Sequence, residues 1–280
     1  MSFLETVKGI SQEPTNKLTI IMGYPGSGKT TVAGTYPKPM LYVSIGDDGG
    51  GIVLKKYSDN EIKSLHLKTD SEGTSVNKVK ALLKELKDNP NHGYKTIVFD
   101  AWTSLQEELE QYVRTMKKGA NLNFDEWASI GKELLDCRDK VVDLSKTQDC
   151  EFVLICHVKD KEDTDNLTNE ISKSIVPKMT GTNGKILLER ATVVAYCCRK
   201  PVKNADGSLS VKFLTYLGAH PNIDTKLRTP KKLFDGVGIY VEDCTYDKIK
   251  DLINGSAVEK VDVVDTPTNP FETDKGDKQW

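Results

Sequence analysis

The chain has 280 residues, of which 38% are hydrophobic and 29% charged, and its formal net charge is −2. This composition is typical of a soluble globular protein with one large domain or two small ones. The charge balance excludes a global basic surface, so any nucleic-acid binding has to be local. The sequence has no signal peptide and no apolar run of about 18 residues, so we expect a cytoplasmic protein with no membrane partner.

The six cysteines do not follow a metal-binding or disulfide pattern. None belongs to a C-x-x-C pair, and several lie in apolar runs; they are Cys137, Cys150, Cys156, Cys197, Cys198 and Cys244. We therefore expect buried free thiols in a reducing compartment.

A glycine-rich loop follows the polar lead-in of residues 1–16. Lys17 to Met22 is a short apolar run rich in β-branched residues, which predicts a buried strand. The next residues, Gly23 to Thr30, read GYPGSGKT and match the phosphate-binding pattern G-x-x-x-x-G-K-[ST]. Thr30 to Thr35 predicts a short helix, which Pro37 stops.

Strand, glycine loop and helix form the arrangement that nucleotide phosphates require. Glycines let backbone N–H groups turn onto phosphate oxygens, and the helix N-terminus adds a favourable dipole. Lys29 supplies a cation for the β- and γ-phosphates, and Thr30 supplies a hydroxyl for Mg²⁺. We expect the nucleotide to contact Gly23, Tyr24, Pro25, Gly26, Ser27, Gly28, Lys29, Thr30 and Thr31.

A second apolar strand, Met40 to Ile45, runs into Asp47, Asp48 and three glycines. Ligands of parallel α/β sheets lie beyond the carboxyl ends of the strands, so these two carboxylates are candidate site residues. The alternative is a polar turn in which aspartate makes local hydrogen bonds.

A third strand ends in another carboxylate. Gly73 to Asp88 predicts an amphipathic helix, and Lys95 to Asp100 is an apolar strand that closes on Asp100. This is the Walker B pattern, in which the aspartate holds the Mg²⁺ shell beside the phosphate loop. The alternative is an aspartate that caps the following helix.

The middle of the chain predicts two helices, Ser104 to Lys118 and Phe124 to Leu144, and then a buried strand that ends at His157. A polar group there can face the γ-phosphate and report its loss, or it can merely close the strand. The following polar segment, Val158 to Met179, predicts a long loop that is either functional or disordered.

The last part of the chain predicts a strand at Ala191 to Cys198, its hairpin partner at Ser208 to Leu217 and a short helix at Tyr246 to Ile253. Residues 199–232 hold eight basic and two acidic residues, which predicts a basic patch. The alternative is an ordinary solvated surface. Glu259 to Trp280 predicts a disordered acidic tail. The expected division is therefore lead-in 1–16, ATPase domain 17–255 and tail 256–280.

Together, the phosphate loop, the Asp-Asp-Gly-Gly after the second strand, Asp100 and His157 resemble the RecA-like ATPase core. More narrowly, the layout resembles phage nucleotide-binding proteins that act as single-strand annealing recombinases, over roughly residues 17–245. The resemblance implies an α/β fold with a mostly parallel sheet, flanking helices and a C-terminal β-hairpin extension. It also implies an ATPase that uses Mg²⁺.

The resemblance also implies roles for single residues. Asp48 falls on the family's catalytic carboxylate and His157 on its phosphate sensor, while a mobile DNA-binding loop falls within Val158 to Gly184. Arg199 and Lys200 resemble positions that reach the nucleotide of a neighbouring subunit. The implied partners are single-stranded DNA, further copies in a ring or filament, and a single-strand binding protein. The candidate DNA-binding residues are Lys159, Lys161, Lys173, Lys178, Arg199 and Lys200.

The resulting prediction is an ATPase that single-stranded DNA stimulates and that acts in phage-type recombination by annealing or filament formation. Lys29, Asp48 and His157 carry the catalytic roles. The alternatives are a DNA-repair or helicase-loading ATPase with the same core, a nucleotide-gated annealing protein with negligible turnover, and a P-loop kinase of a small molecule.

Overall fold

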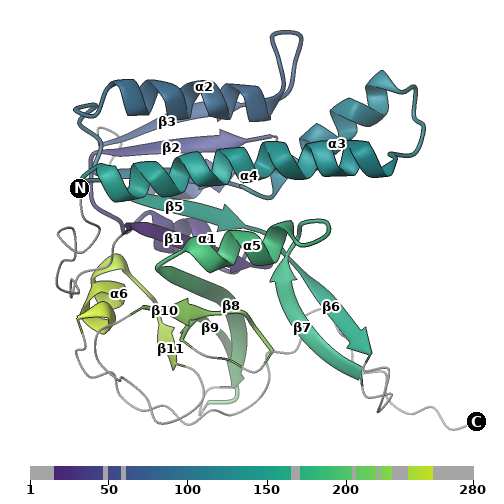
Figure 1. The fold of residues 1–280 in the computed structure, drawn as a ribbon. Helices are drawn as coiled ribbons and strands as arrows, with labels where there is room; N and C mark the ends of the chain where they lie inside the picture. The colour runs from purple at the N-terminus through teal and green to yellow at the C-terminus, as the bar shows by residue number, and fades with distance from the viewer. Residues whose placement is uncertain are drawn as a thin grey trace, which may run out of the picture.

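The computed structural model describes residues 16–46, 50–57, 61–164, 171–203, 206–218, 220, 222–228 and 239–254. These residues form a mixed α/β fold around one large sheet, with helices on both faces (Figure 1). The expected mostly parallel sheet with flanking helices is confirmed. The lead-in before residue 16 and the acidic tail lie outside the described residues, so the predicted disorder of the tail stays a prediction.

The sheet runs in the order β11-β9-β8-β1-β5-β4-β2-β3, and β10 pairs with β8. The six strands from β8 to β3 are parallel, whereas β9, β10 and β11 pair in the antiparallel sense. The parallel strands are β1 (Leu18–Gly23), β2 (Met40–Ile45), β3 (Ile62–Leu67), β4 (Thr96–Asp100), β5 (Glu151–Cys156) and β8 (Val193–Lys203). The others are β9 (Leu209–Leu217), β10 (Lys226–Leu227) and β11 (Ile239–Glu242).

The central strands are continuous apolar runs because both of their faces are covered. Every residue of β1, β2 and β4 is buried. One face packs on α2 (Ser75–Asp88), α3 (Ser104–Met116), α4 (Phe124–Thr147) and α5 (Asn183–Arg190). The other face packs on α1 (Lys29–Ala33), the 3₁₀ helix η2 (Gly50–Tyr57) and α6 (Tyr246–Ile253).

Side chains fix where several of these helices begin. The Thr74 hydroxyl accepts the backbone N–H of Asn77 at 3.2 Å at the start of α2. Asn123 and Glu126 form a capping box at the start of α4. Such caps satisfy backbone N–H groups that the first helical turn leaves without partners.

The prediction of an unstructured loop at Val158 to Met179 is wrong, because this segment contains a β-hairpin. β6 (Val158–Thr164) and β7 (Ile171–Pro177) form a separate two-stranded antiparallel sheet that projects from the body (Figure 1). Its exposed positions are mostly polar, and Glu162 pairs with Lys173 across the strands at 3.1 Å. Val158 and Ile175 at the base of the hairpin are buried, but most of its residues are exposed and polar, so it lacks the sustained apolar alternation by which sequence analysis detects strands.

Four further elements were not predicted, namely β3, η2, β10 and β11. The edge strand β3 exposes most of its residues, and its place depends on pairing with β2 rather than on its own sequence. The 3₁₀ helix η2 begins at Gly50, within the run of glycines after β2. The predicted C-terminal hairpin is present as β8 and β9, but β8 also pairs with β1 and thus extends the central sheet itself.

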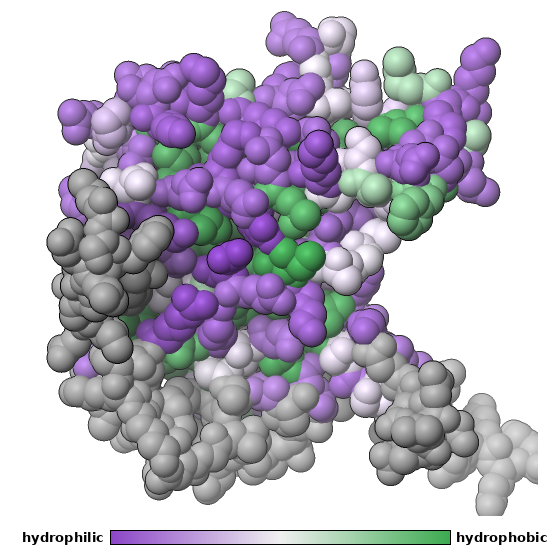
Figure 2. All heavy atoms as spheres, viewed as in Figure 1, coloured by the Kyte–Doolittle hydropathy of each residue, from purple (hydrophilic) through white to green (hydrophobic). Residues whose placement is uncertain are grey.

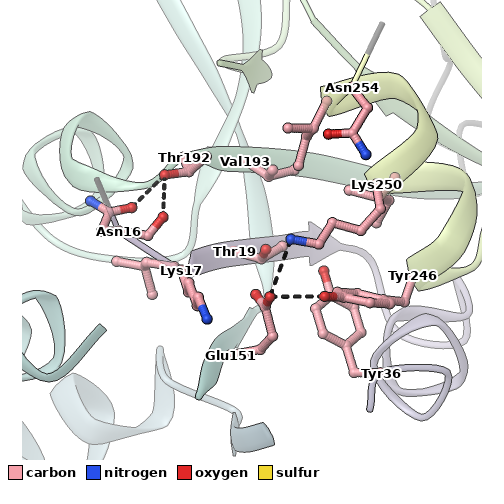
Figure 3. Close-up of a pocket in the computed structure, with 13 residues that line it drawn as sticks. Asn16, Lys17, Thr19, Tyr36, Glu151, Thr192, Val193, Tyr246, Lys250 and Asn254 are labelled. Atoms are coloured by element: carbon pink, nitrogen blue, oxygen red, sulfur yellow. Dashed lines mark hydrogen bonds and ion pairs between the residues drawn. The ribbon is translucent and has the colours of Figure 1, made fainter. Parts of the chain in front are cut away.

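A cavity of about 270 Å³ lies at the edge of the sheet where β1, β5 and β8 begin (Figure 3). The Glu151 carboxylate accepts a hydrogen bond from the Tyr246 hydroxyl at 2.9 Å and pairs with Lys250 at 3.4 Å. The Thr192 hydroxyl donates to the backbone carbonyl of Asn16 at 2.9 Å. These contacts join α6 and the first described residue to the starts of the strands.

The expected buried thiols are confirmed. All six cysteines are free, and five of them are buried. Burial raises the pKa of the Cys156 thiol to about 12, so this group stays protonated and unreactive near neutral pH. Among the described helices, none has the length and apolar composition that a bilayer crossing requires.

Candidate functional site

The phosphate loop lies between the end of β1 and the start of α1, as predicted. Gly28 has φ of 91°, a left-handed conformation that favours glycine. A side chain at Gly23 would meet the carbonyl oxygen of Cys197 at 2.3 Å, so the approach of β8 requires glycine there. The loop conformation therefore depends on both its own glycines and the neighbouring strand.

Lys29 is folded back onto its own loop. Its Nζ atom donates to the backbone carbonyls of Gly23 and Tyr24, both at 3.0 Å, and the residue is 6% exposed. Backbone carbonyls are neutral acceptors, which a phosphate oxygen replaces with a stronger, charge-assisted hydrogen bond. The lysine is thus held beside the site by contacts that a phosphate can displace.

Asp100 stands at the end of β4, where it binds two hydroxyls. The Thr30 hydroxyl donates to Asp100 Oδ2 at 2.9 Å, and the Tyr42 hydroxyl donates to the same oxygen at 2.7 Å. Asp100 is 2% exposed. The residues predicted to form the metal site, Thr30 and Asp100, are therefore in direct contact.

A cavity of about 400 Å³ opens between these groups. It is lined by Pro25, Gly26, Ser27, Gly28, Lys29, Thr30, Thr31, Ile52, Val53, Asp100, His157 and Phe213. Asp100 and His157 lie on the side of β4 and β5, whereas Phe213 comes from β9 on the other side of β1. The cavity thus has a polar side and an apolar rim.

The residues fit a nucleoside triphosphate with Mg²⁺. The Ser27 hydroxyl is buried and lacks a hydrogen-bond partner among the described residues, which suits an incoming phosphate oxygen. A hydroxyl and a carboxylate are oxygen ligands of the kind that Mg²⁺ prefers, with phosphates and water in its other positions. No cluster of three or more His, Cys, Asp or Glu suited to a metal occurs in the part of the chain that the structure describes.

The two other predicted catalytic residues have different outcomes. His157 lines the cavity, and its backbone N–H donates to the hydroxyl of Thr103 at 3.2 Å. It stands between β5 and β6, and its role in sensing the γ-phosphate stays a prediction. Asp47 and Asp48 lie outside the described residues, and the base role of Asp48 stays a prediction.

The six candidate DNA-binding residues lie in three places. Lys159, Lys161 and Lys173 are exposed on the β6–β7 hairpin, and Lys178 follows it and pairs with Glu107 at 2.9 Å. Arg199 and Lys200 lie on β8. The Arg199 guanidinium lies near the phosphate loop of its own chain, 3.5 Å from where a Cβ at Gly26 would be.

Sequence reasoning did not find four residues of the site, Tyr42, Ile52, Val53 and Phe213. Tyr42 reaches Asp100 because β2 is the neighbour of β4 in the sheet, an order that the sequence does not reveal. Phe213 lies against Gly28 because β9 folds back along β8, and a Cβ at Gly28 would be 3.2 Å from its ring. The only signal for Phe213 in the sequence was an aromatic residue within a predicted hairpin.

One comparison with known proteins gave a match. A family model described as an AAA domain matches residues 15–229, which include the phosphate loop, Asp100, His157 and the two hairpins. A search of curated proteins found no match.

Proposed function

The chain belongs to the AAA domain family of P-loop ATPases, and on that basis we propose that it binds and hydrolyses ATP. The observation that carries the proposal is the set of contacts around Lys29, Thr30 and Asp100 beside one cavity. In this set a lysine, a hydroxyl and a carboxylate lie where phosphates and their metal ion are bound in such proteins.

Each residue has a definite task in this proposal. Lys29 leaves the Gly23 and Tyr24 carbonyls and binds the β- and γ-phosphates, while the loop N–H groups orient them. Thr30 and Asp100 hold Mg²⁺, with Tyr42 fixing the carboxylate. Mg²⁺, when bound, neutralises charge on the phosphate oxygens. Asp48 is proposed to accept the proton of the attacking water, and His157 to respond to loss of the γ-phosphate.

The proposal is tested by measuring nucleotide affinity and phosphate release with the full chain. We expect ATP binding that Mg²⁺ strengthens and turnover that a chelator abolishes. Absence of ATP binding in the presence of Mg²⁺ would contradict the proposed function. Phosphate transfer to a small molecule instead of water would identify a kinase.

We further propose that the protein acts on single-stranded DNA in a recombination process and assembles from several copies. The support is the projecting β6–β7 hairpin with exposed lysines, together with basic residues on β8 and β9. On β8 and β9, Lys200 and Lys212 lie directly opposite each other. Because the chain has a net charge of −2, one copy presents a weak basic surface, and repetition along the strand would strengthen it.

Fluorescence anisotropy with a labelled oligonucleotide tests this second proposal. We expect binding that requires an ATP analogue, is cooperative and weakens steeply with salt. Replacing Arg199 and Lys200 by Glu should abolish it, whereas the matched reversal of Lys84 and Lys87 on the exposed face of α2 should not. Undetectable binding at low salt with nucleotide present would remove the DNA proposal and leave the ATPase proposal standing.

A further inference from the structure

Tyr24, the second residue of the phosphate loop, contacts two parts of the molecule at once. Its backbone carbonyl accepts the hydrogen bond from Lys29 Nζ at 3.0 Å. Its side-chain hydroxyl donates to the carboxylate of Asp160 on β6. A single residue therefore joins the lysine of the nucleotide site to the projecting hairpin.

The base of the hairpin is also attached to the helix that follows Asp100. The backbone N–H of Thr180, just after β7, donates to Gln106 Oε1 at 3.1 Å. Lys178 pairs with Glu107 at 2.9 Å. Gln106 and Glu107 belong to the first turn of α3, a few residues beyond Asp100. The hairpin is thus held on one side by the phosphate loop and on the other by the segment after β4.

The two faces of β6 differ in what they carry. Asp160 lies on the same face as Glu162, because alternate residues of a strand share a face. Lys159 and Lys161 occupy the opposite face, and both are exposed. The contact with Tyr24 therefore uses the acidic face of the strand, which leaves Lys161 on the face turned away from this contact.

The geometry points to Tyr24 and Asp160 as positioning residues that couple the position of Lys29 to the β6–β7 hairpin. A phosphate that draws Lys29 away from the Tyr24 carbonyl removes the contact on one side of Tyr24. The hydroxyl on the other side transmits the change to Asp160. Coupling of this kind is reciprocal. If nucleotide changes the affinity of the hairpin for a ligand by some factor, that ligand changes the affinity of the protein for nucleotide by the same factor.

This inference rests on the proposed function, because it requires a nucleotide that binds Lys29. The experiment is hydrogen exchange of the full chain with and without a non-hydrolysable ATP analogue and Mg²⁺, read at residues 158–164 and 171–177. In the unmodified protein we expect the analogue to change the exchange rates of these residues by about fivefold. This is the lower end of the factors by which one ligand site usually changes the affinity of another. Nucleotide affinity is measured in the same samples with a fluorescent analogue.

The variants separate coupling from a structural effect. Tyr24→Phe and Asp160→Ala should each abolish the nucleotide-dependent difference, and the double variant should lose no more than either single one. Asp160→Asn should retain the difference, because its amide oxygen still accepts from Tyr24. Glu162→Gln, on the same face of β6 but paired with Lys173, serves as the matched control and should retain it as well.

The outcomes distinguish the two proposals. Nucleotide binding with no exchange change in the hairpin of the unmodified protein would overturn the coupling and leave the ATPase proposal intact. Persistence of the change in Tyr24→Phe would also overturn it, provided that the variant melts at the same temperature. Absence of nucleotide binding would overturn both.

Discussion

The two edges of the parallel sheet use polar side chains in different ways. At the edge where the strands end, Lys29 contacts the carbonyls of residues five and six positions earlier in the chain. At the edge where the strands begin, Tyr246 contacts Glu151 across 95 positions, and Thr192 contacts Asn16 across 176 (Figure 3). The Lys29 contacts are local, although Asp100 at the same edge binds Thr30 and Tyr42 across 70 and 58 positions. The contacts at the other edge join distant parts of the chain.

We expect the Lys29 contacts to matter for ligand binding and the contacts at the opposite edge to matter for stability. A local contact restricts few conformations, so breaking it costs the fold little and a ligand can replace it. A contact between distant segments holds elements whose alignment the folded state requires, here α6 against the starts of β5 and β8. Substitution of Lys29 and substitution of residues at the opposite edge should therefore have opposite effects on nucleotide binding and on unfolding.

The largest expected effect is at Lys29. Lys29→Ala removes charge-assisted hydrogen bonds to phosphates, so nucleotide affinity or turnover should fall by at least about 100-fold. The melting temperature should stay within about 2 °C of the unmodified value, because two local contacts are lost. Calorimetric titration and thermal melting measure both, with Lys84→Ala on exposed α2 as the control. Normal turnover by Lys29→Ala would contradict the assignment of the site.

Asp100 should show a smaller effect of the same kind. Asp100→Asn keeps an oxygen that accepts from Thr30 and Tyr42 but removes the negative charge. The Mg²⁺ concentration required for half-maximal nucleotide binding should rise by about tenfold or more. Titration of Mg²⁺ at fixed nucleotide measures the change. Tyr42→Phe should produce a weaker shift in the same direction, and an unchanged Mg²⁺ requirement in Asp100→Asn would exclude this carboxylate from the metal site.

Glu151 at the opposite edge should show the reverse pattern. Glu151→Ala removes the acceptor of the Tyr246 hydroxyl and the partner of Lys250, so the free energy of unfolding should fall by about 1–3 kcal/mol. Nucleotide affinity should remain within twofold. Urea unfolding of the variant tests this, with Asp149→Ala as the control, since that neighbouring carboxylate is exposed and should cause no measurable change.

The smallest expected effect is a dependence of stability on alkaline pH. Burial, and then the adjacent Glu151 carboxylate, raise the pKa of Tyr246 above its ordinary value near 10. The stability that this group contributes is present below that pH and is lost as pH rises through the folded-state pKa. Tyr246→Phe should therefore lose less stability between about pH 9 and pH 11 than the unmodified protein does. If urea unfolding shows that both proteins lose the same unfolding free energy over this pH range, Tyr246 does not cause the pH dependence.

The exposed apolar residues are unevenly distributed over the surface. Figure 2 shows a mostly hydrophilic face with apolar side chains in its middle and others toward the outer end of α3 and α4. Met116 is 70% exposed and Phe124 is 85% exposed. Met116 is the last residue of α3 and Phe124 the first of α4, so both lie at helix ends.

The parts predicted from the sequence are those encoded by neighbouring residues. The strand, loop and helix around Lys29 appear in one continuous stretch, and the carboxylate of Asp100 closes its own apolar strand. The contacts that complete the site depend on strand order, which places Tyr42 beside Asp100 and Phe213 beside Gly28. The hairpin of β6 and β7 escaped prediction because its solvated faces carry no apolar period.

The buried thiols provide an internal probe of how the sheet opens. Cys156, at the end of β5, has no exposed surface, and Cys197 on β8 is 1% exposed. A thiol reagent can modify either one only when the elements packed over it move away, so the labelling rate measures that local opening. These two cysteines lie on either side of β1, the strand that leads into the phosphate loop. The labelling rates of Cys156 and Cys197 with and without nucleotide would therefore show whether nucleotide binding changes local opening on either side of this strand.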